Sequence, residues 1–266
     1  MSSTSLGYTA PVTPAQAGRV AWTVISIFIV ETVVFGFSVL PAFTFWTWTM
    51  TWVPERPVMG TPILRPAVVA MSLIPAYLVF AFSLVALSAF STKVCGWRTQ
   101  PGGMWKLRDL EWPLLKWSRY MISTHVVRVL VGTFFRASPL WTLYMRWNGA
   151  RMGRGVHINS LSISDHNMLE FGDGVVIGEN VHLSGHTVEG GMVKTGPVKL
   201  GRFVTVGLGS LVGINVEAGE RCQIGAMSAV LKGTKLDAGS VYVGVPVRKI
   251  EKNAPAAVIE TALLDA

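Results

Sequence analysis

The chain has 266 residues, of which 50% are hydrophobic and 14% are charged, with a formal net charge of +8 and a mean hydropathy of +0.45. This composition is too apolar for an ordinary soluble domain and excludes disorder over most of the chain. All ten Trp residues lie at or before Trp147, whereas 18 of the 27 Gly residues follow position 150. The sequence therefore predicts a membrane domain over residues 1–150, a glycine-rich repeat domain over residues 151–253 and a tail over residues 254–266.

Two long apolar runs predict transmembrane helices. Residues 20–40 are almost wholly apolar apart from Glu31, and residues 67–90 form a second such run. Each is long enough to cross a hydrocarbon layer of about 30 Å as a helix. The first run is long and lacks a strongly basic start, which is not typical of a cleaved signal peptide. Glu31 has two interpretations, a buried functional carboxylate or a structural residue paired with a helix or lipid group.

Aromatic residues mark the segment between the two runs. Four of them precede two prolines, as expected for an interfacial aromatic belt followed by a short outer loop: Phe45, Trp46, Trp48, Trp52, then Pro54 and Pro57. Residues 113–136 are predicted to form a further helix, which carries too many charged side chains to insert fully into the membrane. We expect this helix to lie in the interface or under the hairpin, with Trp112 and Trp117 at headgroup depth.

Positive charge is concentrated after the second run. From Lys93 to Arg154 there are 11 Lys or Arg residues against Asp109 and Glu111, whereas the rest of the chain has 12 basic and 13 acidic residues. Such a segment favours contact with anionic lipid on the cytoplasmic side, so both helix ends are expected there. The sequence shows no recognition-helix or zinc-finger pattern, and no nucleic-acid partner is expected. Two separated cysteines, Cys95 and Cys222, predict neither a disulfide framework nor a thiolate metal site.

A repeat of six residues organises the second half. An apolar residue recurs through eight consecutive hexads without a slip, at Leu200, Val206, Val212, Ala218, Ile224, Val230, Leu236 and Tyr242. A helix needs a period near 3.6 and an amphipathic strand a period of two, so neither explains the pattern. A period of six predicts a parallel β-helix, in which stacked coils bury a continuous core.

The hexad register breaks once, between Leu183 and Leu200. The intervening segment, which begins Ser184-Gly-His-Thr-Val-Glu-Gly-Gly, does not fit a coil, and we expect it to loop outward. Loops of this kind usually carry the binding face of a repeat protein.

These motifs resemble a known family. The hexad run, the loop with His186, and the closing segments that start at Ile224 and Val243 are similar to the left-handed β-helix acyltransferases of the hexapeptide-repeat family. More narrowly, the run from Ser138 to Val156, followed by Ser164-Asp165, Gly172-Asp173 and His186-x-x-Glu189-Gly-Gly, resembles the membrane-embedded terminal part of nonribosomal peptide synthetases of the ε-poly-lysine-synthetase type. No adenylation or carrier domain is present in the sequence, which departs from that pattern.

The resemblance implies a fold and a reaction. The fold would be an N-terminal transmembrane helical hairpin with interfacial helices, followed by a left-handed parallel β-helix of hexapeptide repeats. The active sites would lie between the β-helices of a homotrimer, with a loop histidine as general base. Only His186 matches that position. The donor would be a CoA thioester, acetyl-CoA by default, or a phosphopantetheine-bound acyl group.

Acyl transfer needs a base and an oxyanion donor. Imidazole suits the first task because its unperturbed pKa of about 6.5 is near cytosolic pH. A carboxylate would orient the imidazole, and Asp165 is preferred over Glu189 and Glu170. The backbone N–H groups of Gly190 and Gly191, or of Gly207, are candidate oxyanion donors.

The resemblance also places the donor. CoA or phosphopantetheine would lie along the solenoid, against Gly207, Gly209, Gly225 and Ala226. Basic side chains near its phosphates would be Lys232, Arg248 and Lys249. For each of these, a turn glycine or a solvated surface charge is the alternative interpretation.

Other functions stay open at this stage. A peptide-bond-forming enzyme would take aminoacyl groups from a carrier protein, which would dock on the basic segment of residues 106–119. A zinc site of the carbonic-anhydrase type would need His182 and His186 with a third ligand such as His157, but the spacing does not match and no metal is expected. His157, His166 and His182 are otherwise structural. A non-catalytic trimeric membrane scaffold is a further alternative.

Overall fold

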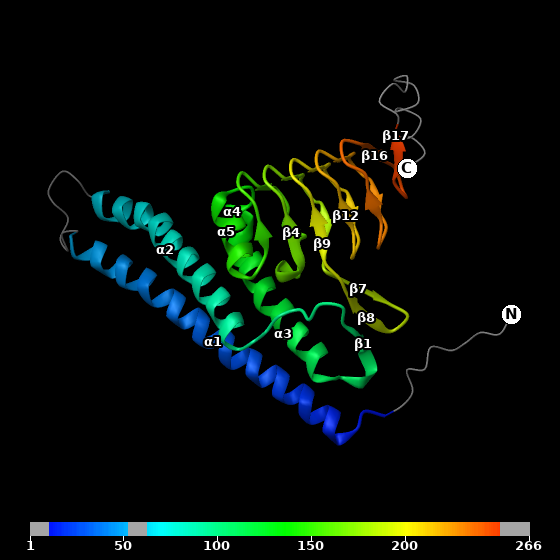
Figure 1. The fold of residues 1–266 in the computed structure, drawn as a ribbon. Helices are drawn as coiled ribbons and strands as arrows, with labels where there is room; N and C mark the ends of the chain where they lie inside the picture. Colours follow the sequence, from blue (N-terminus) through cyan, green and yellow to red (C-terminus); the bar gives the residue numbers. More distant parts are fainter. Residues whose placement is uncertain (1–10, 53–62, 251–266) are drawn as a thin grey trace.

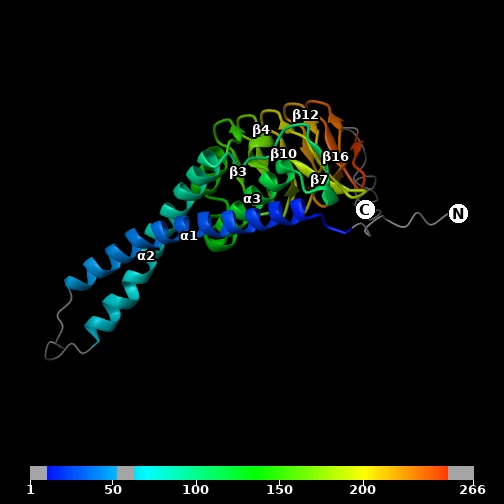
Figure 2. The ribbon, with the colours of Figure 1, turned by 90° about the horizontal axis from the view of Figure 1, so that it is seen from below.

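The computed structural model describes residues 11–52 and 63–250 of the chain. Two long helices, α1 (Pro14–Thr51) and α2 (Leu64–Val94), pack against each other and project from a β-rich body (Figures 1 and 2). Both are long and apolar enough to cross a membrane, and only 17% and 22% of their most apolar windows are buried. Most of this apolar surface is therefore left uncovered by the protein, as lipid-facing helices require. Pro54, Pro57 and the tail after residue 250 lie outside the described residues.

The expected third helix is present and bends. It consists of α3 (Trp112–Val127), a π-helical turn η2 (Arg128–Gly132) and α4 (Thr133–Phe135), and α3 packs on both long helices. A short helix that the sequence did not predict, α5 (Pro139–Trp147), then leads into the repeats. Ahead of α3 lie strand β1 (Met104–Lys106) and the 3-10 turn η1 (Leu107–Asp109).

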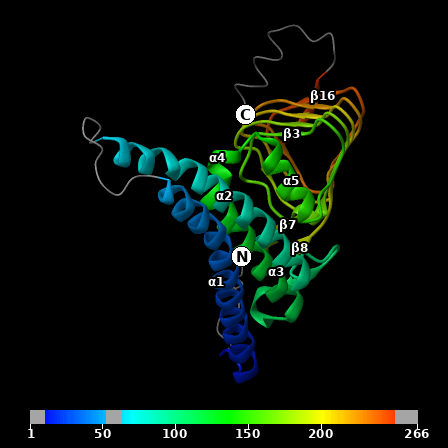
Figure 3. The ribbon, with the colours of Figure 1, turned by 90° about the vertical axis from the view of Figure 1, so that its left-hand side faces the viewer.

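The hexads form stacked coils of three sides. Paired residues are 18 positions apart, as in Thr205 with Gln223, Leu211 with Ala229 and Glu217 with Lys235, so three hexads complete one coil. The strands of successive coils stack into three parallel sheets, which Figure 3 shows in a view along the stack. The first sheet contains β3 (His157–Ile158), β5 (Val176–Ile177), β10 (Thr205–Val206), β13 (Gln223–Ile224) and β16 (Val241–Val243), with β17 (Arg248–Ile250) antiparallel at its edge. The second contains β6 (His182–Leu183), β11 (Leu211–Val212) and β14 (Ala229–Val230), and the third contains β2 (Arg151–Met152), β4 (Leu169–Phe171), β9 (Val198–Leu200), β12 (Glu217–Ala218) and β15 (Lys235–Leu236).

Two positions of the six-residue repeat explain how the coils pack. The apolar hexad positions point inward, and Val206, Val212 and Val230 are at most 1% exposed. The glycine that follows lies where the next coil passes, because a Cβ on Gly207 would stand 2.4 Å from the backbone N of Ala226. Apolar side chains and close stacking thus come from the same six-residue unit.

The core crosses the predicted domain boundary. One cluster of buried side chains runs from Leu84 of α2 through Trp141 and Tyr144 of α5 to Ile158 and onward along the coils. The division at residues 150 and 151 stays a prediction, but the helices and the first coil pack as one body.

The segment that breaks the hexad register is a β-hairpin rather than an irregular loop. Strand β7 (His186–Glu189) pairs antiparallel with β8 (Met192–Thr195), and β8 pairs on its other side with β1. Trp105, Leu114 and Val193 form a small apolar cluster beneath it. Because β1 covers the hairpin's edge, the chain between α2 and α3 is tied to the one irregular part of the coil.

Candidate active site

His186 and Asp165 lie together where the hairpin leaves the coil. His186 opens β7, and Asp165 lies one coil earlier, in the turn before the 3-10 helix η3 (His166–Met168). The Nδ1 atom of His186 is 2.5 Å from Oδ2 of Asp165. Asp165 adopts a left-handed conformation (φ 54°), and Gly185 must lack a side chain because a Cβ there would be 2.8 Å from that of Asp165. The backbone is therefore shaped to bring the two side chains together.

Four other side chains hold the carboxylate. Its Oδ1 atom accepts hydrogen bonds from the hydroxyl of Thr99 (2.6 Å) and the indole N–H of Trp117 (3.0 Å). Its Oδ2 atom accepts from the hydroxyls of Ser164 and Ser184, each at 3.2 Å. Asp165 is completely buried. A buried carboxylate with its oxygens fully engaged is fixed in orientation.

These bonds keep the carboxylate charged. Burial by itself raises the pKa of Asp165, but the hydrogen bond and charge of His186, with the bonds from Thr99 and Trp117, bring the pKa below its ordinary value. A carboxylate only accepts hydrogen bonds, so the Nδ1 atom of His186 carries a hydrogen. In the neutral imidazole, Nε2 is then the basic atom.

The imidazole is reachable from outside. The side chain of His186 is 20% exposed. The ring of Trp117 packs edge-on against it, with ring centroids 4.9 Å apart, and the Ser184 hydroxyl lies 2.8 Å from Nδ1. His186 is therefore held on one side and open on another, as a general base must be.

Several of these residues escape sequence reasoning. Thr99 belongs to the segment after α2, and Trp117 lies on α3, where the sequence predicted headgroup contact. Neither has a motif that points to Asp165, which is 66 and 48 positions away, respectively. Ser164 and Ser184 do stand beside the candidate residues in the sequence, and that adjacency was the available signal.

The other two candidate carboxylates lie elsewhere. Glu189 is near the hairpin tip, where it binds Lys194 (2.7 Å) and Lys232 (2.6 Å), and hydrogen bonds from these lysines lower its pKa to about 2. Glu189 is three positions after His186 on the same strand, and its side chain therefore points to the opposite face. Glu170 forms an ion pair with Arg151 on the outside of the coil. Neither carboxylate contacts His186. The glycines proposed as oxyanion donors, 190 and 191, form the hairpin tip rather than its base.

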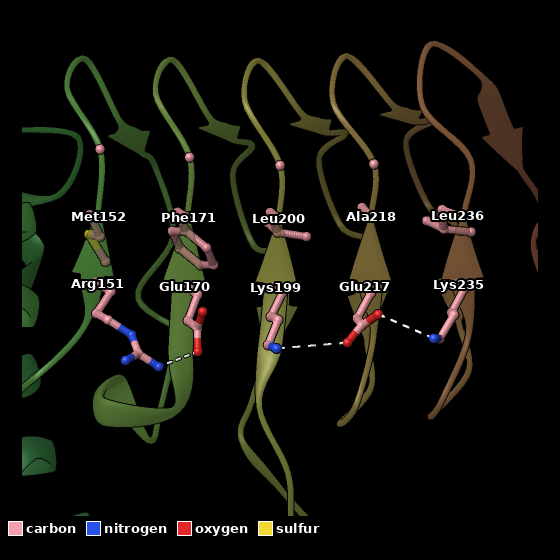
Figure 4. A pocket seen from close by; sticks show the side chains of 14 residues that line it. Arg151, Met152, Glu170, Phe171, Lys199, Leu200, Glu217, Ala218, Lys235 and Leu236 are labelled. Atoms are coloured by element: carbon pink, nitrogen blue, oxygen red, sulfur yellow. Dashed lines mark hydrogen bonds and ion pairs between the residues drawn. The ribbon is translucent and has the colours of Figure 1, made fainter.

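Glu170 belongs to a charged groove of about 810 Å³ on the outer face of the third sheet. Figure 4 shows its row of outward side chains, Arg151, Glu170, Lys199, Glu217 and Lys235, which alternate in sign from one strand to the next across the sheet. The Glu217 carboxylate lies 3.8 Å from the Lys199 ammonium and 3.5 Å from that of Lys235. The two carboxylates are thus paired with three basic side chains, which leaves one excess positive charge, and neither His186 nor Asp165 lines the groove.

The predicted donor-binding residues are only partly brought together. The four small residues, Gly207, Gly209, Gly225 and Ala226, stack on one corner of neighbouring coils. Lys232 instead lies beside the hairpin. On the last strands, Lys249 bonds to Asp237 at 2.8 Å and Arg248 lies on β17. The three basic residues therefore form no single cluster within the described chain.

The remaining histidines differ in setting. His157 is exposed on β3, and His166 is buried in η3. His182 lies on the outer face of β6, where burial, with the charges of His186 and Arg128, lowers its pKa. Over residues 11–52 and 63–250, no group of three His, Cys, Asp or Glu side chains is arranged to hold a metal ion.

Comparison with known proteins gives one curated sequence relative. The chain is 26% identical over 138 residues to a delta-poly-L-ornithine synthetase from Acinetobacter baumannii (strain AB307-0294). The match covers 51% of this chain but only 10% of the synthetase. No family model matches the sequence. The match confirms the resemblance to synthetases of the ε-poly-lysine type.

Solved structures with a similar arrangement carry acyltransferase names. A hexapeptide-repeat acetyltransferase from Vibrio cholerae is 18% identical, with 41% of this chain and 65% of that chain covered and a TM-score of 0.36. A serine acetyltransferase in complex with CoA is 16% identical, with 71% and 64% covered and the same TM-score of 0.36. The N-acyltransferase AntD from Bacillus cereus is 25% identical in one structure with dTDP and coenzyme A, with 43% and 90% covered and a TM-score of 0.30.

Proposed function

We propose that this protein is a membrane-anchored acyltransferase that moves an acyl or aminoacyl group from a thioester to an amine or hydroxyl. The observation that carries the proposal is the His186–Asp165 pair, with its 2.5 Å hydrogen bond and its buried, fully engaged carboxylate. A histidine that is oriented by a charged carboxylate and still reachable is suited to general-base catalysis.

This arrangement supports the following step. The Nε2 atom of His186 takes the proton of the acceptor N–H or O–H as that atom attacks the thioester carbonyl. A C–N or C–O bond forms, the C–S bond breaks, and the thiolate leaves with the proton that His186 carried. Asp165 stabilises the imidazolium between these events and keeps Nδ1 as the hydrogen-bearing nitrogen.

We further propose the assembly in which this chemistry occurs. The three-sided coil would be a left-handed β-helix, and three copies would form a homotrimer whose donor groove is completed by a neighbour. A thioester arm would lie along the corner of Gly207 and Gly225, beside the exposed side chains of Leu208 and Met227. Helices α1 and α2 would cross the bilayer and leave the β-helix in the cytoplasm, beside the basic segment.

The donor in this proposal is CoA, with acetyl-CoA as the default. Peptide-bond formation with an aminoacyl carrier protein is the second candidate, and the similarity to a poly-ornithine synthetase favours it. The two differ in what presents the thioester, because a carrier protein needs a docking surface and CoA does not.

The test is thioester consumption by detergent-purified protein, with acetyl-CoA, longer acyl-CoAs and aminoacyl carrier proteins as donors. We expect turnover that is lost in His186→Ala and kept in His157→Ala, a matched histidine on the exposed face of β3. Turnover of carrier-bound groups alone would move the assignment to peptide-bond formation. Turnover that survives in His186→Ala would refute the proposed base, and inactivity with every donor would favour a scaffold.

A further inference from the structure

A cavity of about 260 Å³ adjoins the dyad on the side of α3. Its walls are mostly apolar, and they come from four parts of the chain: Met121, Ile122, Thr124, His125 and Val126 of α3, Arg128 of η2, Trp141 of α5, and Ile163, Ser164 and His166 of the first coil. At about 30 Å³ for each water molecule, this is the space of roughly eight to nine waters. The volume suits a short apolar chain and is too small for CoA.

The cavity borders the active site at Ser164. Ser164 lines it, and the same hydroxyl donates to Asp165 and lies 2.9 Å from the Ser184 hydroxyl. On α3, Met121 is one turn beyond Trp117, whose ring packs on His186. A molecule with its body in the cavity can therefore place one end near the dyad.

His166 lines the cavity, and one of its ring nitrogens is buried without a hydrogen-bond partner among the described residues. It is 2% exposed, and its Nδ1 atom has no hydrogen-bond partner within the described chain. Burial lowers the pKa of His166 to about 4, so the ring is neutral near pH 7, and it also hydrogen-bonds to the backbone of Ile163. A buried ring nitrogen left unpaired is unfavourable unless a ligand supplies the missing bond.

The charge of the lining restricts that ligand. Arg128 is the lining cation, held by His125 Nδ1 and by the carbonyl of Leu161 at 3.5 Å. The lining contains no carboxylate. An ammonium group inside the cavity would meet a like charge and no counter-ion.

We propose that this cavity binds the acceptor of the acyl transfer, and that the bound part is an apolar chain whose far end carries a neutral hydrogen-bond donor rather than an ammonium. That the bound molecule is the acceptor rests on the proposed function. The chain would lie between α3 and Ile163, its far end would donate to His166, and its reacting amine would stand at His186. The exposed apolar residues Val129 and Phe134, 59% and 74% exposed on the same helical segment, would let such an amphiphile approach from the bilayer.

Three probes of equal length separate the possibilities: octylamine, 8-amino-1-octanol and 1,8-diaminooctane. Binding is measured without catalysis, as protection of Ile122→Cys, on the cavity wall, from a small maleimide in a Cys95→Ser background. Val129→Cys, on the same helical segment but outside the cavity, is the matched control for partition into detergent. We expect 8-amino-1-octanol to protect best, octylamine next, and the diamine about tenfold more weakly or worse, because its second ammonium would be buried beside Arg128.

Two variants complete the test. In His166→Leu the preference for the amino-alcohol over octylamine should disappear, and Val126→Phe, which fills the cavity, should abolish protection by all three probes. Equal protection of the cysteines at 122 and 129, or strongest protection by the diamine, would overturn the inference. With an active donor, the same order should hold in the acceptor KM. If no thioester is consumed but protection follows the expected order, the proposed function fails while the ligand class of the cavity stands.

Discussion

Replacement of Asp165 by Asn tests the orienting carboxylate with almost no change of volume. In the wild type, Oδ1 accepts from Thr99 and Trp117, and Oδ2 accepts from Ser164, Ser184 and His186: five donors on two oxygens. An amide has only one oxygen, so one of these two groups of donors must face an NH₂ group.

Both orientations of the amide damage the site. With NH₂ toward Trp117, an indole that can only donate is left buried and unpaired, which costs about 1–3 kcal/mol of stability. With NH₂ toward His186, the serine hydroxyls can rotate but the imidazole must change tautomer. Its hydrogen then moves to Nε2, the atom that should accept the substrate proton. Loss of the charge or of the tautomer should lower turnover by about 10² to 10⁴, the range seen when such pairs are broken elsewhere.

The assay is thioester turnover by Asp165→Asn at several pH values, with the midpoint of thermal unfolding measured on the same samples. The control is Asp173→Asn, since Asp173 accepts a bond from the backbone of Arg154 (2.6 Å) on an exposed turn and should leave turnover unchanged. A folded Asp165→Asn protein with turnover within about threefold of wild type, less than 1 kcal/mol, would refute the orienting role.

The same structure leads to four further expected outcomes. Trp117→Phe keeps a ring on the histidine but removes the 3.0 Å donor to Asp165, and turnover should fall by about tenfold, one hydrogen bond's worth. Gly185→Ala should lower the free energy of unfolding by about 1–3 kcal/mol, because the added Cβ would lie 2.8 Å from the Cβ of Asp165. His166 is neutral in the folded state down to a pKa of about 4 but protonates near 6.5 when unfolded, so stability should fall by about 3 kcal/mol as the pH drops from 6.5 to 4, and His166→Leu should flatten this slope in urea unfolding. Glu189→Gln should leave turnover unchanged, since that carboxylate binds only the two lysines near the hairpin tip among the described residues; a large loss would return Glu189 to the site.

The repeat could be read from the sequence because one unit encodes both packing and spacing. An apolar residue every six positions can only be buried repeatedly if the chain coils, and the 18-residue pairing of Thr205 with Gln223 follows from three such units. The two long helices were similarly predictable from their apolar length, although α1 and α2 extend beyond the predicted spans. The hairpin and β1 were not, because their pairing joins segments about 90 residues apart, Trp105 with Val193.

The site was predictable only where local sequence carried it. His186 stood in the one break of a regular register, and Asp165 preceded it by about one coil, so their approach could be expected. Thr99 and Trp117 reach the carboxylate through tertiary packing of α3 and the preceding segment, for which no periodic signal exists. Glu189 is near His186 in the sequence but not in space, because residues three positions apart on a strand point to opposite faces.

The packing of the membrane-proximal segment gives the site a property that neither half of the chain has alone. Asp165 belongs to the coil, but both donors on its Oδ1 atom come from residues between α2 and the middle of α3. The same segment contains the strand that covers the hairpin's edge, and the second half of α3 supplies one wall of the cavity next to the dyad. A β-helix cut off at residue 151 would therefore keep His186 and Asp165 yet lose the groups that orient them. Under the proposed function, the segment that follows α2 is a component of the active site, because the Asp165 carboxylate depends on Thr99 and Trp117 for its Oδ1 hydrogen bonds.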